Sequence, residues 1–313
     1  MKKSIKISIV LVMVASSFIG KAQQAPMFTH YMYNTIAVNP AYAGSRDALT
    51  LTGLHRSQWV GFKGAPTTQT LSLHGPLKNE HIGLGASILN DKIGAVNNTS
   101  AFFDFSYIMK VSKKSKLALG LSAGANMMQA RYSSVEINTQ SDPVFQSDIN
   151  NKLTPNFGFG AYYYREKFYA GVSTPNILEN TYTSVKLENG TSLSAKEQRH
   201  YFLIVGALFN LAENLAFKPT SLVKVTTNAP VEADFTASFV IMKKLLVGAM
   251  YRTGDSFGGL VGVDITKQFH IGYSYDWSFG VKTPVYNQGS HEIVLRYDFL
   301  LFDKKQVHSP RNF

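Results

Sequence analysis

The sequence contains no cysteine, only 2 tryptophans in 313 residues, and charged residues at only 16% of its positions. Without cysteine, the chain has no disulfide, no thiolate metal site and no cysteine-borne lipid anchor. Beyond the N-terminus, no stretch approaches the roughly 18 apolar residues that a transmembrane helix requires. These absences exclude a disulfide-stabilised domain, a lipoprotein and a helical membrane protein.

The N-terminus has the features of an export signal. Lys2, Lys3 and Lys6 precede an apolar run at 7–19, and small residues follow up to Ala22. This order is typical of a Sec signal peptide, and we predict cleavage near Ala22. Cleavage removes four of the 31 basic residues and none of the 20 acidic ones, so the net charge falls from +11 to +7.

Residues that favour strands are abundant. The chain has 21 Phe, 16 Tyr and 24 Gly, with 45% hydrophobic residues and a mean hydropathy of −0.05. After Asp47, apolar side chains alternate with small or polar ones, as where Ile293 and Leu295 alternate with Arg296 and Asp298. A period of two predicts extended strands with two different faces.

Bulky side chains gather on one of these faces and small ones on the other. In the segment 117–128, Leu117, Leu119 and Leu121 alternate with Ala118, Gly120 and Ser122. Such faces suit lipid outside and a wet or plugged interior, which inverts the arrangement of a water-soluble barrel. We therefore predict an all-β fold, a transmembrane antiparallel β-barrel in the outer membrane of a Gram-negative bacterium.

The alternating segments number about fourteen, and single-chain bacterial barrels have an even strand count. No linker or internal repeat interrupts them. We predict a signal peptide at 1–22, a plug-like N-terminal segment at 23–47, a barrel at 48–302 and a periplasmic tail at 303–313. The predicted strands begin near residues 49, 67, 81, 99, 116, 154, 167, 200, 215, 231, 245, 257, 269 and 291.

The connections between these segments fall into two sets. Every second one is long or rich in glycine and proline, and bacterial barrels place long loops outside and short turns in the periplasm. An even strand count returns both termini to the periplasm on this assignment. The predicted extracellular connections are 59–66, 90–97, 130–153, 174–199, 226–230, 253–256 and 278–290.

The predicted periplasmic turns are rich in lysine. Lys113, Lys114, Lys243 and Lys244 lie on two of them. One interpretation is that they are solvated residues near lipid head groups. The other is that an acidic periplasmic partner binds this rim.

The segment 23–47 does not alternate, although it carries Phe28, Tyr31, Tyr33 and Tyr42. A floppy periplasmic arm would not expose four aromatic rings to water, so we predict that it enters or caps the lumen. The strand phase also projects charges inward. These are Arg252, Asp264, Asp276, Arg296 and Asp298. Buried opposite charges normally pair, so we expect a network that braces the barrel, with ion conduction as a second interpretation.

Motifs for catalysis or metal binding have the wrong context. The GLSAG sequence at 120–124 matches a nucleophile elbow by letter, but strand alternation continues through it. Ser290 and His291 are strand neighbours and point to opposite faces, so they do not share a proton. The 8 histidines show no metal-ligand spacing. We predict no enzymatic activity and no cofactor.

Six motifs in and near the loops form a distinctive set. They are NPAYAGS at 39–45, HRSQWVGFKGAP at 55–66, NDKIG at 90–94, YRTGD at 251–255, GYSYD at 272–276 and SHEI at 290–293. These motifs resemble the PorP/SprF family of type IX secretion membrane proteins of Bacteroidetes. The resemblance extends over nearly the whole mature chain and is greatest to the SprF branch, which is associated with gliding motility.

This resemblance implies a non-enzymatic role in secreting or anchoring a partner adhesin that bears a type-B C-terminal domain. It also implies contact with periplasmic parts of the secretion or gliding machinery, and no nucleic-acid partner. Many of the motif residues fall at the predicted extracellular rim, where they are candidate partner contacts, although Trp59 equally suits an interfacial aromatic girdle. They are Arg56, Gln58, Trp59, Phe62, Lys63, Asn90, Asp91, Arg252 and Asp255.

Two other functions compete with this one. A passive porin would need an open lumen with rings of like charge, whereas the inward charges here are of mixed sign. An outer-membrane hydrolase would need a nucleophile and a base on one face, which the sequence does not supply.

Overall fold

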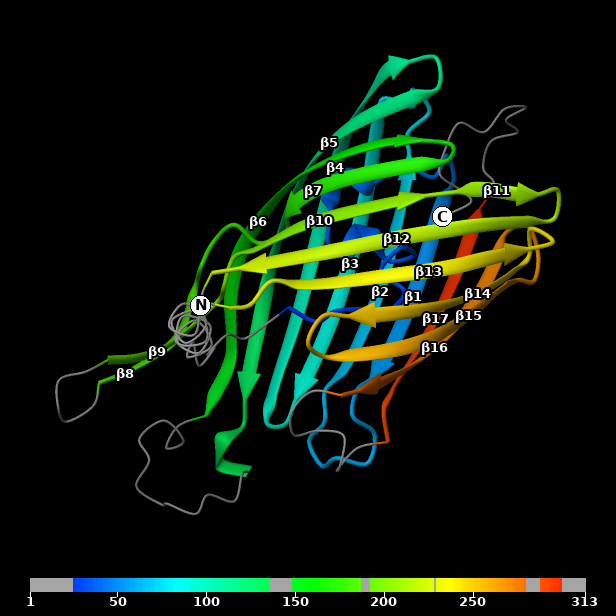
Figure 1. Ribbon diagram of the computed structural model, residues 1–313. Coiled ribbons are helices and arrows are strands. Elements are labelled where there is room, and N and C mark those ends of the chain that lie inside the picture. Colours follow the sequence, from blue (N-terminus) through cyan, green and yellow to red (C-terminus); the bar gives the residue numbers. More distant parts are fainter. Residues whose placement is uncertain (1–24, 135–147, 187–191, 228, 280–287, 300–313) are drawn as a thin grey trace, which may run out of the picture.

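The computed structural model describes residues 25–134, 148–186, 192–227, 229–279 and 288–299 (Figure 1). Fourteen antiparallel strands form a closed barrel, because β1 pairs with β17 and β10 pairs with β12. The barrel strands are β1 (Leu49–Ser57), β2 (Thr67–Pro76), β3 (Ile82–Ile93), β4 (Val96–Ser112), β5 (Ser115–Ala130), β6 (Ile149–Arg165), β7 (Phe168–Thr174), β10 (His200–Ala207), β12 (Leu215–Thr226), β13 (Glu232–Ile241), β14 (Leu245–Arg252), β15 (Ser256–Asp264), β16 (Phe269–Ser278) and β17 (Ser290–Phe299). A short strand, β11 (Phe209–Ala212), follows β10 along β12.

The predicted strand count is confirmed, and most predicted strand starts lie within one residue of the observed ones. The short strand β11 was not predicted, and neither was a hairpin in one of the loops. The connection between β7 and β10 carries a separate hairpin of β8 (Thr181–Lys186) and β9 (Ser192–Lys196). Strands of six and five residues are too short to stand out by alternation from a polar loop.

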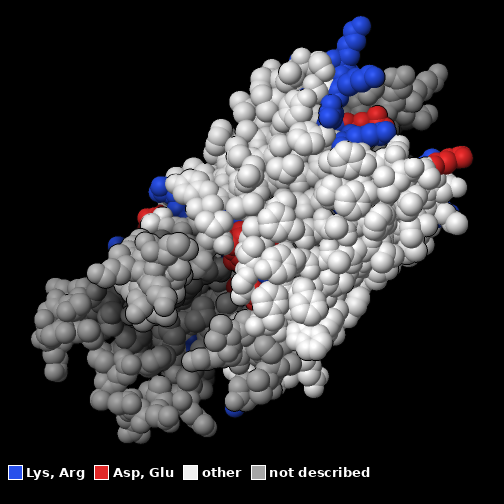
Figure 2. All heavy atoms as spheres, viewed as in Figure 1, with Lys and Arg blue, Asp and Glu red and all other residues white. Residues whose placement is uncertain are grey.

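The two faces of the barrel differ as the alternation predicts. Large apolar side chains point outward and are exposed, as are Phe103, Leu121 and Phe235, whereas Ser106 and Ser274 point inward and are fully buried. Figure 2 shows a wall almost without charged atoms, with Lys and Arg gathered mainly toward its upper end. An uncharged apolar band matches the hydrocarbon layer of a bilayer.

The barrel has two unlike ends. The loop end carries the connections that follow β1, β3, β5, β7, β12, β14 and β16, and the turn end carries the short turns between the other strands together with the start of β1 and the end of β17. One predicted loop is wrong. Residues 90–97 belong to β3 and β4, which continue to a two-residue turn at Gly94 (φ +56°), so Asn90 and Asp91 lie within a strand.

Strand length varies around the ring. β4, β5 and β6 have 17, 16 and 17 residues, whereas β13 to β17 have between 8 and 10. The barrel wall is therefore taller on the β4–β6 side, where the β4–β5 hairpin projects at the turn end (Figure 1).

The predicted signal peptide at 1–22 and the tail at 303–313 lie outside the described residues. No described helix has the length and apolar character needed to cross a membrane.

Candidate functional site: the barrel interior and its two rims

The N-terminal segment, residues 25–47, lies inside the ring of strands and runs from the loop end to the turn end. At the loop end, the Ala25 amide donates to His200 Nε2 (3.1 Å) and the Ala25 carbonyl accepts from Lys224 Nζ (3.0 Å). At the turn end, Arg46 Nη2 lies 2.9 Å from Asp298 Oδ2, and Asp298 is one residue before the end of β17. The described chain therefore starts at the loop end, opposite to the end at which β1 starts and β17 ends.

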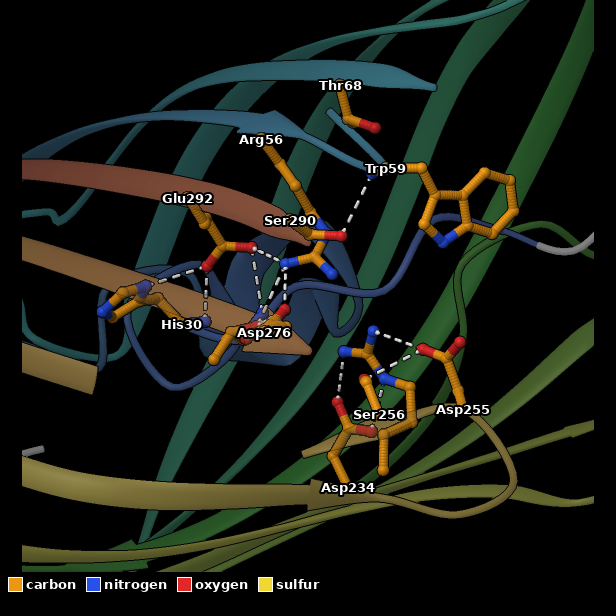
Figure 3. A network of polar contacts seen from close by, with 12 residues as sticks. His30, Arg56, Trp59, Thr68, Asp234, Asp255, Ser256, Asp276, Ser290 and Glu292 are labelled. Atoms are coloured by element: carbon orange, nitrogen blue, oxygen red, sulfur yellow. Dashed lines mark hydrogen bonds and ion pairs between the residues drawn. The ribbon is translucent and has the colours of Figure 1, made fainter. Parts of the chain in front are cut away.

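Charged groups hold the first part of this segment near the loop end (Figure 3). Arg56 Nη1 lies 2.6 Å from Asp276 Oδ2 and 3.1 Å from Glu292 Oε2. Glu292 also accepts hydrogen bonds from the backbone amides of Thr29 (3.0 Å) and His30 (2.6 Å). All of these groups are buried, so each charge depends on its partners rather than on water.

A second ion pair lies beside the first one in Figure 3. Arg252 donates through Nε and Nη2 to both carboxylate oxygens of Asp234, at 2.7 and 2.8 Å. Lys224 lies 2.7 Å from Glu232 and links this pair to Ala25. Two-pronged arginine–carboxylate contacts fix orientation as well as charge.

Another group of charges lies toward the turn end. Asp298 accepts from Arg46 (2.9 Å) and from the Thr50 hydroxyl (2.7 Å). The Tyr33 ring lies between two cations, with Lys218 Nζ 5.0 Å and the Arg296 guanidinium carbon 4.9 Å from its centroid. Cation–π contacts of this kind are strongest where water is excluded.

The second part of the segment packs on a wall of glycines. A Cβ atom added to Gly120 would lie 2.2 Å from the Ala41 nitrogen, and one on Gly83 would lie 2.1 Å from the Ala43 oxygen. We call the inner faces of β3, β5, β6 and β7 the glycine wall, and those of β1 and β12–β17 the charged wall. The glycine wall comprises Gly83, Gly85, Gly120, Gly160 and Gly171.

The NPAYAG motif supplies the residues that meet this wall. Asn39 accepts from the Ala41 amide (3.0 Å) and caps the short 3₁₀ helix Pro40–Tyr42. Its amide nitrogen donates to the Ala161 carbonyl of β6 (3.1 Å). Gly44, with φ +76°, approaches Gly83 so closely that only glycine fits.

Two of the residues predicted at the extracellular rim are not at a surface. Arg56 and Arg252 are each 1% exposed, because their strands turn these side chains inward to buried carboxylates. Phe62 and Lys63 are exposed in the β1–β2 loop, and Gln58 and Trp59 are half-buried there. Asp91 accepts from Thr68 (2.6 Å), Asn90 donates to Thr99 (2.8 Å), and Asp255 lies 3.5 Å from Arg252.

The four predicted periplasmic-rim lysines are exposed at the turn end but are not gathered in one place. Lys113 and Lys114 form the β4–β5 turn, and Lys243 and Lys244 lie in the β13–β14 turn. In the strand order these two turns lie on nearly opposite sides of the ring.

The predicted lumen residues belong to separate groups rather than to one network. Asp276 contacts Arg56, and Arg296 lies near Asp298, whereas Asp264 pairs with His270 at 2.7 Å and its side chain is 45% exposed. Sequence reasoning missed several interior residues. Glu292 and Asp234 share the inward phase of their strands and were identifiable, but His30 and Arg46 lie where the chain has no period.

The residues of the motifs that resemble catalytic ones make packing contacts and hydrogen bonds within the barrel. Gly120 lies within β5 beneath Ala41, and Ser290 Oγ accepts from the Trp59 amide while the His291 ring contacts the Tyr273 hydroxyl. Within the described part of the chain, no three metal-ligating side chains are grouped.

Solved structures with similar strand arrangements are outer-membrane proteins of very low sequence identity. Omp33 of Acinetobacter baumannii is 11% identical with a TM-score of 0.46, and the alignment covers 82% of this chain and 100% of Omp33. A deltaS2S3 mutant of the monoaromatic hydrocarbon channel TodX is 11% identical with a TM-score of 0.45, and the alignment covers 85% of this chain and 94% of the TodX chain.

Sequence comparison gives a more specific result. No curated protein matches the chain. The family described as type IX secretion system membrane protein PorP/SprF matches residues 20–297. The match does not separate the two branches, so membership of the SprF-like branch stays a prediction. Because the matched region includes almost all of the barrel and the whole N-terminal segment, the chain belongs to the PorP/SprF family of type IX secretion system membrane proteins.

Proposed function

We propose that this outer-membrane barrel supports the secretion or cell-surface anchoring of a partner adhesin with a type-B C-terminal domain, and that it has no enzymatic activity. On this proposal the loop end is extracellular and binds the adhesin, and the turn end contacts periplasmic parts of the secretion or gliding machinery. Family membership supports a role in type IX secretion. The N-terminal segment inside the barrel supports a connector rather than an open pore.

The observation that carries the proposal is a preformed aromatic loop at the loop end. The Val60 amide donates to the Gly289 carbonyl (2.9 Å), and the Gly94 amide donates to the Gly64 carbonyl (3.0 Å), so the loop is braced on both sides. Phe62 is 53% exposed on this loop. A rigid loop with an exposed aromatic ring has the character of an interface anchor, because little entropy is lost on binding.

The test is removal of the aromatic anchors. We expect the double variant Trp59→Ala, Phe62→Ala to reduce surface adhesin on intact cells about tenfold, which corresponds to the loss of one or two anchor residues. Adhesin in the medium and on cells is measured with antibody, together with the amount of folded barrel. Phe103→Ala is the matched control, since Phe103 is 75% exposed on the outer wall. Normal adhesin display by the double variant would contradict the proposal.

The proposed periplasmic contact is tested separately at the two lysine turns. Because Lys113 and Lys114 lie far around the ring from Lys243 and Lys244, reversing one pair at a time shows which side a partner contacts. We expect one pair, changed to glutamate, to reduce co-purification of periplasmic components. If both pairs can be reversed without effect, these lysines are only solvated turn residues.

Conductance separates this proposal from a passive porin. With residues 25–47 inside the barrel, we expect no steady single-channel current across a planar bilayer. A stable open current from the purified wild-type barrel would favour the porin.

A further inference from the structure

A cavity of about 340 Å³ lies in the interior between the N-terminal segment and the inner faces of β2–β5. The connection from β7 to β10 covers it at the loop end, where Glu197 accepts from Asn126 (2.6 Å) and Asn156 (2.9 Å) on the barrel wall. Asp91, Asp104 and Glu197 contribute to its lining, and none of the described lining residues is a lysine or an arginine. This acidic lining is unusual in a chain with a net charge of +11.

Asp104 differs from the other buried carboxylates of the barrel. It is 5% exposed, and its Oδ2 has no hydrogen-bond partner among the described residues. Asp234, Asp276 and Glu292 are equally buried but each lies against an arginine. A buried carboxylate without a cation is strongly unfavourable, and inside a membrane barrel such a residue marks a functional site.

Other unpartnered oxygen atoms face the same cavity. Asn34 Oδ1, Asn98 Oδ1, Asn176 Oδ1 and Ser122 Oγ are buried, and none has a hydrogen-bond partner in the part of the chain that is described. Amide oxygens and a carboxylate only accept hydrogen bonds, so the group that satisfies them is a donor. A lysine ammonium offers three donors and an arginine guanidinium five.

Part of the remaining lining is apolar. Ile36 and Val38 from the N-terminal segment face Phe102 and Met128 from the strands. A long alkyl stem fits such walls while its charged end reaches a polar group, as lysine and arginine side chains do elsewhere. A hydrated metal ion or a compact inorganic cation would leave these walls unused.

We propose that the cavity binds a lysine or arginine side chain of an extended peptide that enters from the loop end, with Asp104 as the counter-ion. The identification of the occupant as part of a secreted protein rests on the proposed function. The acidic lining favours a cation, the unpartnered acceptors require a hydrogen-bond donor, and the apolar walls suit an alkyl stem. A lysine or arginine side chain has all three properties.

The experiment uses the full barrel in lipid nanodiscs and a fluorescent peptide of glycine and serine with one central lysine. We expect the peptide to bind about tenfold more tightly than its acetyl-lysine counterpart, which keeps the stem but has no charge. Asp104→Asn keeps the side-chain shape and is expected to abolish that preference. Asp148→Asn is the matched control, because Asp148 is an exposed loop-end carboxylate outside the cavity lining.

Folding of each variant is checked by heat-modified gel mobility, and Ser122→Ala provides a second, milder change that is expected to weaken binding severalfold. Equal binding of both peptides, or unchanged binding by folded Asp104→Asn, would overturn the inference. So would a carbodiimide cross-link between Asp104 and an amine of the same chain, because the cavity would then be filled internally. Loss of peptide binding by Asp104→Asn with unchanged adhesin display would support the cavity site and overturn the identification of its occupant as part of the adhesin, whereas the proposed function fails only with the Trp59 and Phe62 variant.

Discussion

The glycine wall and the charged wall hold the same N-terminal segment by different interactions. On the glycine wall, glycine positions in the strands let the backbone at Ala41 and Ala43 come closer to the strands than any other residue would permit. On the charged wall, the segment is held by buried groups such as Arg56 and Glu292, which contact Thr29 and His30. The glycine wall therefore binds the segment by matching its shape, and the charged wall binds it by charged contacts.

This difference shows how a barrel fills its interior without a conventional hydrophobic core. Close backbone packing buries no charged group, but any added atom disturbs it. Buried ion pairs must offset the loss of hydration, and their main effect is to fix partners and orientation. The two walls are therefore expected to respond differently to substitution.

The largest effect is expected on the charged wall, from Arg56→Met. This change leaves Asp276 and Glu292 buried without their shared cation, and breaking a buried pair costs about 3–5 kcal/mol. Unfolding in urea from lipid vesicles measures the free-energy change. The triple variant that also has Asp276→Asn and Glu292→Gln serves as the comparison, because it removes the unpaired charges. If Arg56→Met alone is as stable as wild type, the ion pairs do not hold the segment.

A smaller loss of stability is expected on the glycine wall, from Gly120→Ala. The added methyl would lie 2.2 Å from the Ala41 nitrogen and 2.4 Å from its Cα, so the segment must shift. Overpacking of this kind costs about 1–3 kcal/mol. Gly259→Ala is the control, since a Cβ at Gly259 would meet nothing within 4 Å. Equal stability of the two variants, by the same urea unfolding, would show that close packing at Ala41 is unimportant.

The smallest effect on stability is expected from Ala25→Cys. This variant also tests directly the path of the segment between the two walls. The chain has no cysteine, so the new thiol is the only one. Because Ala25 lies at the loop end beside His200 and Lys224, a membrane-impermeant maleimide should label it in intact cells. Lys63→Cys at the loop end and Lys113→Cys at the turn end are the positive and negative controls. Labelling of Ala25→Cys only after cell lysis would reverse the direction assigned to the segment.

Much of the barrel was predictable because alternation is a local property. A strand in lipid must place an apolar residue at every second position. The sequence near Phe103 or Leu121 therefore shows which side chains face the lipid and which face the lumen. The inward phase of Asp276, Arg296 and Asp298 was equally readable. Phase says that a side chain points into the lumen, but it does not say which side chain it meets there.

The strand count, most of the strand starts and the apolar outer face of this protein are thus determined by its sequence alone, together with the identity of its family. Tertiary structure decided the rest. The path of residues 25–47, the pairing of Arg56 with Asp276 and the absence of a described partner for Asp104 depend on which strands face each other when the ring closes. Contacts between residues more than 200 positions apart, in a segment without a period, have no local pattern from which they can be predicted.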